Sequence, residues 1–154
     1  MEKNKALIEQ FYSALKQKEI VELQSLYAEN AVFNDPVFSN LDGKQVRAMW
    51  EMLIKSGKDM RIEFYNVTGD AKGGTAQWDA YYTFSATGKK VVNRITAHFS
   101  IENGKIVKHT DSFSFYNWAR QALGIPGLLL GWSSFIKDKI RERAKKNLES
   151  FMNP

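Results

Sequence analysis

Hydrophobic residues recur at helical spacing in three stretches of the first third of the chain. Residues 7–15 and 46–54 place apolar side chains every three to four positions, which predicts two amphipathic helices. A less regular run over residues 21–27 predicts a short helix between them. Asp42-Gly43 indicates a turn before the third helix, which we expect to end near Gly57 because glycine commonly follows the last helical residue.

From residue 60 to residue 115 the period changes to two, which predicts four antiparallel strands. The expected turns contain glycine and lie at residues 69–74, 87–88 and 103–104. A shorter strand is expected earlier, in AVFNDPVF (residues 31–38). It should stop at Pro36, because proline cannot donate to a sheet ladder.

The two-residue period also predicts which side chains point to the interior of the sheet. The expected inward positions on the last three strands are Ala76, Trp78, Ala80, Tyr82, Phe84; Val91, Asn93, Ile95, Ala97, Phe99, Ile101; and Val107, His109, Asp111, Phe113, Phe115. Asp111 therefore points among hydrophobic side chains. A buried carboxylate is costly unless it is hydrogen-bonded or used in chemistry, so Asp111 is a candidate functional residue.

The segment after residue 115 has a different character. Residues 117–124 predict a short helix closed by Gly124, and residues 125–132 predict a compact apolar loop. Residues 133–152 predict an amphipathic helix with one basic side. Its apolar stripe would close a pocket mouth or pack on a twofold partner; the alternative is peripheral contact with an anionic membrane surface.

The composition fits one globular domain: 154 residues, 44% hydrophobic and 25% charged, without cysteine. The absence of cysteine excludes disulfides, thiolate nucleophiles and cysteine-ligated metals. Residues 1–115 hold 15 basic and 14 acidic side chains, whereas residues 116–154 hold seven and three. Because the body is nearly neutral, we expect no nucleic-acid binding. The charged N-terminus lacks the apolar run of a signal peptide, so we expect a cytoplasmic protein.

Asp35, before Pro36, is the second candidate carboxylate. Each aspartate also has a purely structural interpretation: Asp35 could cap a turn, and Asp111 could bond a tyrosine or tryptophan across the core. If both enter one cavity, desolvation and repulsion should raise at least one pKa. His109 could orient Asp111 or relay a proton, although its place near the start of the strand is also typical of an exposed or merely packed histidine.

Other chemistries have little support in the sequence. His98 lies on the polar face of its strand, where we expect a surface or interface residue. With two histidines and no spacing typical of metal ligands, we expect no metal site. No G-x-S-x-G elbow and no phosphate-binding glycine loop before a helix is present, so neither a serine nucleophile nor a nucleotide cofactor is expected.

LIEQFYSALKQKEIVELQSLYAENAVFNDPVF resembles the opening of ketosteroid isomerases and SnoaL-like proteins, and GKIVKHTDSFSF resembles their last strand. The similarity covers residues 5–115 and implies the nuclear transport factor 2-like fold. This is an α+β architecture in which N-terminal helices wrap a cone-shaped, curved antiparallel sheet. Residues 1–115 would form this domain, and residues 116–154 would add a helical extension packed on it. The resemblance also implies a homodimer formed partly through the outer sheet face.

The resemblance to ketosteroid isomerases implies that Asp35 is the general base. The positions of that family's oxyanion donors hold Phe11 and Ala97, which cannot donate from their side chains. Tyr12 is one residue away, about 100° around the helix. We therefore do not expect authentic steroid isomerase activity.

Two further relatives imply a role for Asp111. In SnoaL-like cyclases the matching aspartate is the acid/base catalyst of an intramolecular aldol closure, and His109 lies on the same face here. Limonene epoxide hydrolases combine that aspartate with an Arg-x-Asp pair on a neighbouring strand. The comparable residues here are Gln77, Trp78 and Asp79, so the arginine is missing and the alternation turns Asp79 outward.

The sequence thus predicts a SnoaL-like protein that binds a small apolar carbonyl compound in a conical pocket. It would act as a cofactor-independent isomerase or cyclase, with Asp35, Asp111 and His109 as the catalytic residues. The predicted ligand-binding residues are Phe11, Tyr12, Trp50, Trp78, Tyr82, Asn93, Ala97, Phe99 and Phe113. The alternatives are a non-catalytic ligand-binding or dimerisation module and, third, an epoxide hydrolase-like activity.

Overall fold

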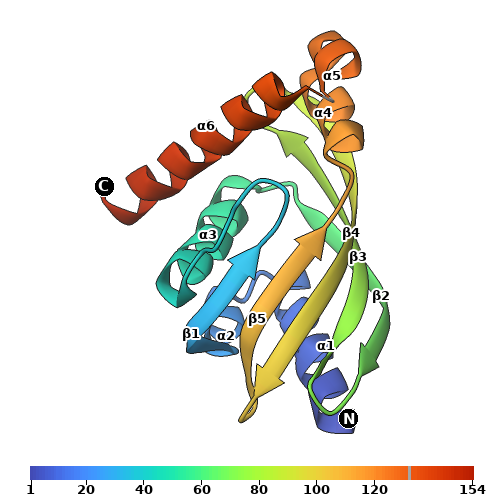
Figure 1. Cartoon of the computed structure of the whole chain (residues 1–154), viewed down its shortest axis with the longest axis vertical. Helices are drawn as coiled ribbons and strands as arrows, with labels where there is room; N and C mark the ends of the chain where they lie inside the picture. The colour runs from blue at the N-terminus through green and yellow to red at the C-terminus, as the bar shows by residue number, and fades with distance from the viewer. Residues whose placement is uncertain (132) are drawn as a thin grey trace.

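The computed structural model describes residues 1–131 and 133–154 (Figure 1). Helices and strands follow one another in the order α1 (Glu2–Lys16), α2 (Ile20–Ser25), β1 (Tyr27–Asn34), α3 (Gly43–Ser56), β2 (Arg61–Gly69), β3 (Gly73–Phe84), β4 (Lys89–Glu102), β5 (Lys105–Ser112), α4 (Phe115–Leu123), α5 (Ile125–Leu130) and α6 (Ser134–Met152). The three N-terminal helices, the short strand between them and the four long strands agree with the pattern of the sequence.

The five strands form one curved sheet in the order β1-β5-β4-β3-β2. Neighbours from β2 to β5 pair antiparallel, whereas β1 pairs parallel with β5, so the sheet is mixed. Helix α1 packs against β2 and β3, and α3 packs against β1. The α+β fold predicted from the sequence is confirmed, and the interior between sheet and helices is where the inward side chains meet.

The alternation predicted for β4 is confirmed by its burial. Asn93, Ala97 and Phe99 are buried, while Arg94 and His98 are exposed. The pairing of β3 with β4 continues without interruption from Gly73 to Phe84, so the two-residue period stays in phase along both strands.

The predicted face of Val107 is wrong. The register between β4 and β5 shifts so that Ile101 faces Ile106 while Ser100 faces Lys108, which makes Val107 the extra residue of a bulge. Ile106 is fully buried in its place. Since the bulge restores the period, His109 still faces the interior.

Two helix starts differ from the sequence prediction because of capping. Asp42, expected in a simple turn, is the N-cap of α3: its carboxylate accepts from Gln45 N, and the Gln45 side chain accepts from Asp42 N. The Ser114 hydroxyl caps α4 by accepting from Asn117 N at 3.2 Å. Phe115, expected on the last strand, therefore begins a helix.

The C-terminal extension is entirely helical where it is described. Residues 125–130 were predicted as part of an apolar loop, but they form α5, with a proline in its first turn. Trp132, in the same predicted loop, lies outside the described residues. Helix α6 buries Leu148 in the main core, and Arg141 Nε donates to Pro36 O at 2.9 Å. Within the described residues, no helix has the length and apolar content needed to cross a membrane.

Candidate functional site

His109 and Asp111 lie on the inner face of β5 and contact each other. His109 Nε2 is 2.8 Å from Asp111 Oδ1, and the exposed fractions of the two residues are 0% and 5%. The other ring nitrogen of His109, Nδ1, is 2.8 Å from Tyr27 Oη. Both nitrogens of the imidazole are therefore engaged inside the protein, and the predicted face of both residues is confirmed.

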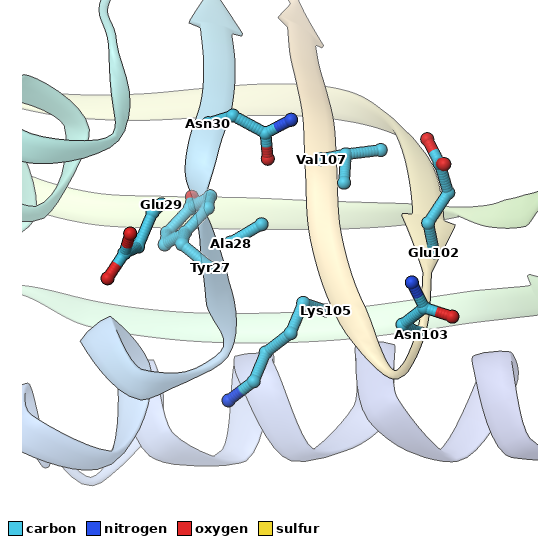
Figure 2. Close-up of a pocket in the computed structure, with 8 residues that line it drawn as sticks. All are labelled: Tyr27, Ala28, Glu29, Asn30, Glu102, Asn103, Lys105 and Val107. Atoms are coloured by element: carbon cyan, nitrogen blue, oxygen red, sulfur yellow. The ribbon is translucent and has the colours of Figure 1, made fainter.

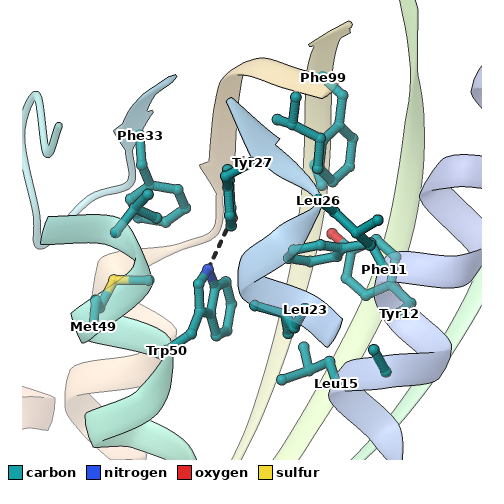
Figure 3. Packing of buried hydrophobic residues seen from close by; sticks show 14 of the residues in the cluster. Phe11, Tyr12, Leu15, Leu23, Leu26, Tyr27, Phe33, Met49, Trp50 and Phe99 are labelled. Atoms are coloured by element: carbon teal, nitrogen blue, oxygen red, sulfur yellow. Dashed lines mark hydrogen bonds between the residues drawn. The ribbon is translucent and has the colours of Figure 1, made fainter. Parts of the chain in front are cut away.

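The hydrogen bonds of His109 continue to Trp50 through Tyr27. Trp50 Nε1 can only donate, and it does so to Tyr27 Oη at 2.8 Å (Figure 3). The Tyr27 hydroxyl contacts His109 Nδ1, and which of the two atoms donates depends on the tautomer of the ring. His109 Nε2 in turn contacts Asp111 Oδ1, so four side chains form one continuous hydrogen-bonded chain from Trp50 to the carboxylate.

Aromatic rings enclose this chain. Phe99 stacks on His109 with ring centroids 4.2 Å apart, while Phe33 and Phe11 meet it edge-on at 5.0 and 5.5 Å. Such an enclosure excludes water and holds the imidazole in one orientation. The sequence had also allowed an exposed histidine here; the parallel pairing of β1, which places Phe33 beside His109, is the reason it is buried.

Asp35 lies on the loop after β1. Its carboxylate caps the turn, and burial in the protein removes part of its contact with water. Oδ1 accepts hydrogen bonds from Val37 N at 2.7 Å and Phe38 N at 2.6 Å. Burial nevertheless raises the pKa of Asp35 to about 6, against the lowering effect of these two bonds, and the charge of Asp111 raises it further. The capping interpretation of Asp35 is therefore confirmed, and the carboxyl that caps the turn is also partly desolvated.

Tyr82, on β3, is hydrogen-bonded to helix α4 of the C-terminal extension. Trp118 Nε1 donates to Tyr82 Oη at 2.7 Å. Burial raises the pKa of the Tyr82 phenol, and the charge of Asp35 adds to this effect. Tyr82, Val37 and Phe113 are half-buried and contact both the main core and the smaller cluster beneath α4. These three side chains mark the part of the interior that is closest to the C-terminal extension.

Two buried donors find no hydrogen-bond partner among the described residues: Tyr12 Oη and Trp78 Nε1. Their rings are in contact, with centroids 5.7 Å apart, and Figure 3 shows Tyr12 pointing from α1 into the core. Burial raises the pKa of Tyr12 well above its usual range, and the charge of Asp111 is the next cause. Tyr12 thus stays protonated, and its hydroxyl lies within the electrostatic influence of Asp111.

Most of the predicted ligand-binding side chains come together in this interior. Phe11, Tyr12, Trp50, Trp78, Ala97 and Phe99 belong to one buried cluster. Ala97 lies directly opposite Asp111 in the β4–β5 pairing, and Asn93 is buried further along β4. Sequence reasoning did not single out Tyr27, whose hydroxyl links Trp50 to His109; its position at a predicted helix end gave no signal of this role.

A separate hollow of about 480 Å³ lies at the surface, where the pairing of β1 with β5 is interrupted between Tyr27 and Val32 (Figure 2). It is lined by Tyr27, Ala28, Glu29, Asn30, Glu102, Asn103, Lys105 and Val107. Neither Asp35 nor Asp111 takes part in it. Over residues 1–131 and 133–154, no group of three or more histidine, cysteine or acidic side chains could hold a metal ion.

Several solved structures have folds similar to this one. A candidate polyketide cyclase from Pseudomonas putida KT2440 is 19% identical and has a TM-score of 0.64; the alignment covers 75% of this chain and 95% of the cyclase. An LEH-like epoxide hydrolase from M. tuberculosis is 15% identical and has a TM-score of 0.64; the alignment covers 88% of this chain and 96% of that protein. A nuclear transport factor 2-like protein of unknown function from Burkholderia pseudomallei K96243 is 15% identical and has a TM-score of 0.68; the alignment covers 79% of this chain and 98% of that protein. At these identities the likeness establishes the fold alone.

A comparison with curated protein sequences finds no match. The family model of the SnoaL-like domain matches residues 8–109, which is more than half of the chain and includes His109 as its last position. The order of helices and strands, the inward-facing His109 and this match agree: the chain belongs to the SnoaL-like family.

Proposed function

We propose that the interior of the sheet binds a small, mostly apolar carbonyl compound and catalyses proton transfer on it without a cofactor. The observation that carries this proposal is the placement of Asp111, in contact with His109, in the same buried interior as Tyr12 Oη and Trp78 Nε1, two donors that have no partner among the described residues. A buried base beside buried donors suits a substrate that loses a proton from carbon and gains negative charge on oxygen.

Asp111 acts as the base in this proposal. It takes a proton from the carbon next to the substrate carbonyl, and the electron pair of the broken C–H bond forms an enolate. The charge on the enolate oxygen is stabilised by hydrogen bonds from Tyr12 and Trp78. The proton then returns to another carbon, which is an isomerisation, or the enolate carbon attacks a second carbonyl whose oxygen takes the proton, which is an aldol cyclisation.

His109 acts as a positioning residue. Its Nε2 contacts Asp111 Oδ1, and Tyr27 helps to fix its own orientation. Asp35, with a pKa of about 6, is present in both protonation states near neutral pH and can supply a proton to an oxygen of the substrate. Asn93, Tyr82 and Phe113 are proposed to contact the rest of the ligand.

The proposal differs from steroid isomerisation in its donors. Phe11 and Ala97, at the positions of the ketosteroid isomerase donors, are fully buried and carry no polar side-chain atom. No observation favours epoxide hydrolysis, because Asp79 is on the outer side of the sheet, where its carboxylate accepts from Tyr65 Oη at 3.0 Å. The required arginine is absent from position 77, which is glutamine.

A non-catalytic binding module is the second candidate, and one observation favours it. Both ring nitrogens of His109 and one oxygen of Asp111 are already used in bonds within the protein. A site of this kind could sequester an apolar ligand while the aspartates serve only as hydrogen-bond acceptors. The two candidates differ in whether Asp111 must change its protonation state.

Exchange of the α-hydrogens of cyclohexanone in D₂O, followed by proton NMR, tests the catalytic proposal. We expect exchange faster than in buffer, and a loss of about 10²-fold or more in Asp111→Asn, the usual effect of removing a general base. Asp79→Asn is the matched control and should exchange at the wild-type rate, because Asp79 lies outside the interior. Exchange no faster than in buffer, or equal rates in wild type and Asp111→Asn, would contradict the catalytic proposal. A thermal shift by the ketone that survives the substitution would then favour the binding module.

A further inference from the structure

Helix α5 and the first turn of α6 expose a cluster of large apolar side chains. The exposed fractions are 73% for Ile125, 53% for Leu128, 62% for Leu129, 47% for Leu130 and 62% for Phe135. We call these five residues the apolar tip. In Figure 1, α5 lies at the end of the molecule opposite the N-terminus. The other exposed large hydrophobic residues of the described chain, Met1, Val21, Val32 and Tyr65, are spread over separate elements.

Packing fixes the outward direction of the apolar tip. Helix α5 rests on α4 through Gly127, where a side chain would collide with Ala119 O. A side chain at Gly131 would collide with Gly127 O and then with the Ala119 side chain. The Tyr116 hydroxyl donates to Leu128 O at 2.9 Å and ties the two helices together. Because the glycines provide the contact with α4, the leucines face outward. Soluble proteins rarely expose contiguous apolar patches without a partner.

Basic side chains border the apolar tip. Lys137 and Lys139 are on the first turns of α6, and Lys139 Nζ is 5.0 Å from the centre of the Phe135 ring. Asp138 lies between them in sequence, and its carboxylate is 3.8 Å from Arg141. Residues 116–154 hold seven basic and three acidic side chains, which accounts for most of the net charge of +5. An exposed apolar cluster with a cationic border is complementary to an anionic lipid surface, where the apolar groups enter the acyl boundary and the cations meet phosphates.

The apolar stripe of α6 itself cannot supply the membrane contact that the sequence allowed. Leu148 is 3% exposed, and Ile136, Ile140 and Ala144 pack against the body. The apolar contribution must therefore come from α5 and Phe135, and α6 contributes charge.

We propose that the apolar tip docks this protein on the surface of an anionic phospholipid membrane. This proposal rests on the exposed residues and their charges and is independent of the chemistry proposed for the interior. Helix α4 connects the apolar tip to the site, because Trp118 of the same helix bonds Tyr82. Docking would place this side of the protein against the bilayer, where apolar compounds accumulate.

Co-sedimentation with vesicles tests the proposal. We expect the wild-type protein to bind vesicles of phosphatidylcholine and phosphatidylglycerol in equal parts. Added salt should dissociate it from these vesicles, and it should not bind vesicles of pure phosphatidylcholine. The double variant Ile125→Gln/Leu128→Gln should lower the bound-to-free ratio at least about tenfold, since it removes two inserted side chains. Val21→Gln, at a residue that is 80% exposed on α2, is the matched control and should bind as the wild type does.

Two double variants that each remove two positive charges distinguish lipid docking from non-specific hydrophobic adsorption. Lys137→Gln/Lys139→Gln should weaken binding, whereas Lys44→Gln/Lys72→Gln, which removes the same charge elsewhere, should leave it nearly unchanged. The proposal is overturned if the wild type does not bind anionic vesicles, or if it binds neutral vesicles equally well. It is also overturned if the protein is a dimer in solution that Ile125→Gln/Leu128→Gln dissociates, because the apolar tip would then be a protein interface.

Discussion

Tyr27 Oη lies 2.8 Å from His109 Nδ1, a contact between residues that are 82 positions apart in the chain. It joins the start of β1 to the middle of β5, the two strands that pair in parallel. Since the Trp50 indole donates to the same hydroxyl, Tyr27 helps to fix the position of the histidine that contacts Asp111. The hydroxyl is therefore expected to matter more for stability than any other phenol in the interior.

Tyr27→Phe should lower the free energy of unfolding by about 2–4 kcal/mol, because it leaves the Trp50 N–H and His109 Nδ1 buried without their partner. Tyr12→Phe is the matched control. Its hydroxyl is buried without a partner in the described chain, so its removal should leave stability unchanged or raise it by up to about 1 kcal/mol. Urea unfolding of both variants measures the difference. Equal losses in the two variants would contradict the hydrogen-bonded chain.

Asp35 should make stability depend on pH in a defined direction. Its folded-state pKa is about 6 against an ordinary value of 3.8, so the fold prefers the protonated form. The stability this provides is complete below the unfolded pKa and is lost as the pH rises through 6, which amounts to about 3 kcal/mol. Asp35→Asn keeps an oxygen for Val37 N and Phe38 N but cannot ionise. The stability of Asp35→Asn relative to wild type should therefore rise as the pH increases from 3.8 to about 6, the unfolded and folded pKa values of Asp35, and then level off.

Urea unfolding of wild type and Asp35→Asn across that pH range is the measurement. Asp59→Asn provides a contrast, since the hydrogen bond from Thr83 lowers the pKa of exposed Asp59 and no such gain is expected. A difference between Asp35→Asn and wild type that does not change with pH would show that the Asp35 carboxyl is not shifted.

The sequence was sufficient to predict the strands and their inward faces wherever the period of the hydrophobic residues and the positions of the turns indicate the same element. The period of two along β3 and β4 correctly placed Trp78, Asn93 and Phe99 inside, because their pairing has no irregularity. It failed at Val107, where one extra residue in β5 shifts the pattern. A bulge is a property of two paired strands, so one strand's own pattern does not reveal it.

The candidate site could be predicted only in part for a related reason. Asp111 and His109 share a face in the sequence pattern, and their contact follows from that. The role of Tyr27 depends on the parallel pairing of β1 with β5, a long-range arrangement that no local period encodes. The sequence did not predict helix α5, because three consecutive leucines between two glycines lack the spacing of three to four residues that is typical of the apolar face of a half-buried helix. The face of α5 that contacts α4 is made by Gly127 instead.

The homodimer stays a prediction that light scattering after size-exclusion chromatography can test. We expect a mass of twice 17.7 kDa. The outer sheet face, expected to form the interface, presents half-buried Thr96 between exposed Arg94 and His98. Thr96→Arg should dissociate such a dimer, because it places unpaired positive charge in the contact. Thr68→Arg, on the edge strand β2, is the control; a monomeric wild type, or a dimer unaffected by Thr96→Arg, would contradict the predicted interface.

Helix α6 should stabilise the domain through Leu148. This side chain is 3% exposed in the main core, so Leu148→Ala should lower the free energy of unfolding by about 2–5 kcal/mol through lost burial and the remaining cavity. Leu128→Ala makes the same chemical change at a residue that is 53% exposed and should stay within about 0.5 kcal/mol of wild type. Thermal and urea unfolding give both values. If Leu148→Ala cost no more than Leu128→Ala, α6 would not be packed on the body in solution, and the contact between Arg141 and Pro36 beside Asp35 would be lost with it.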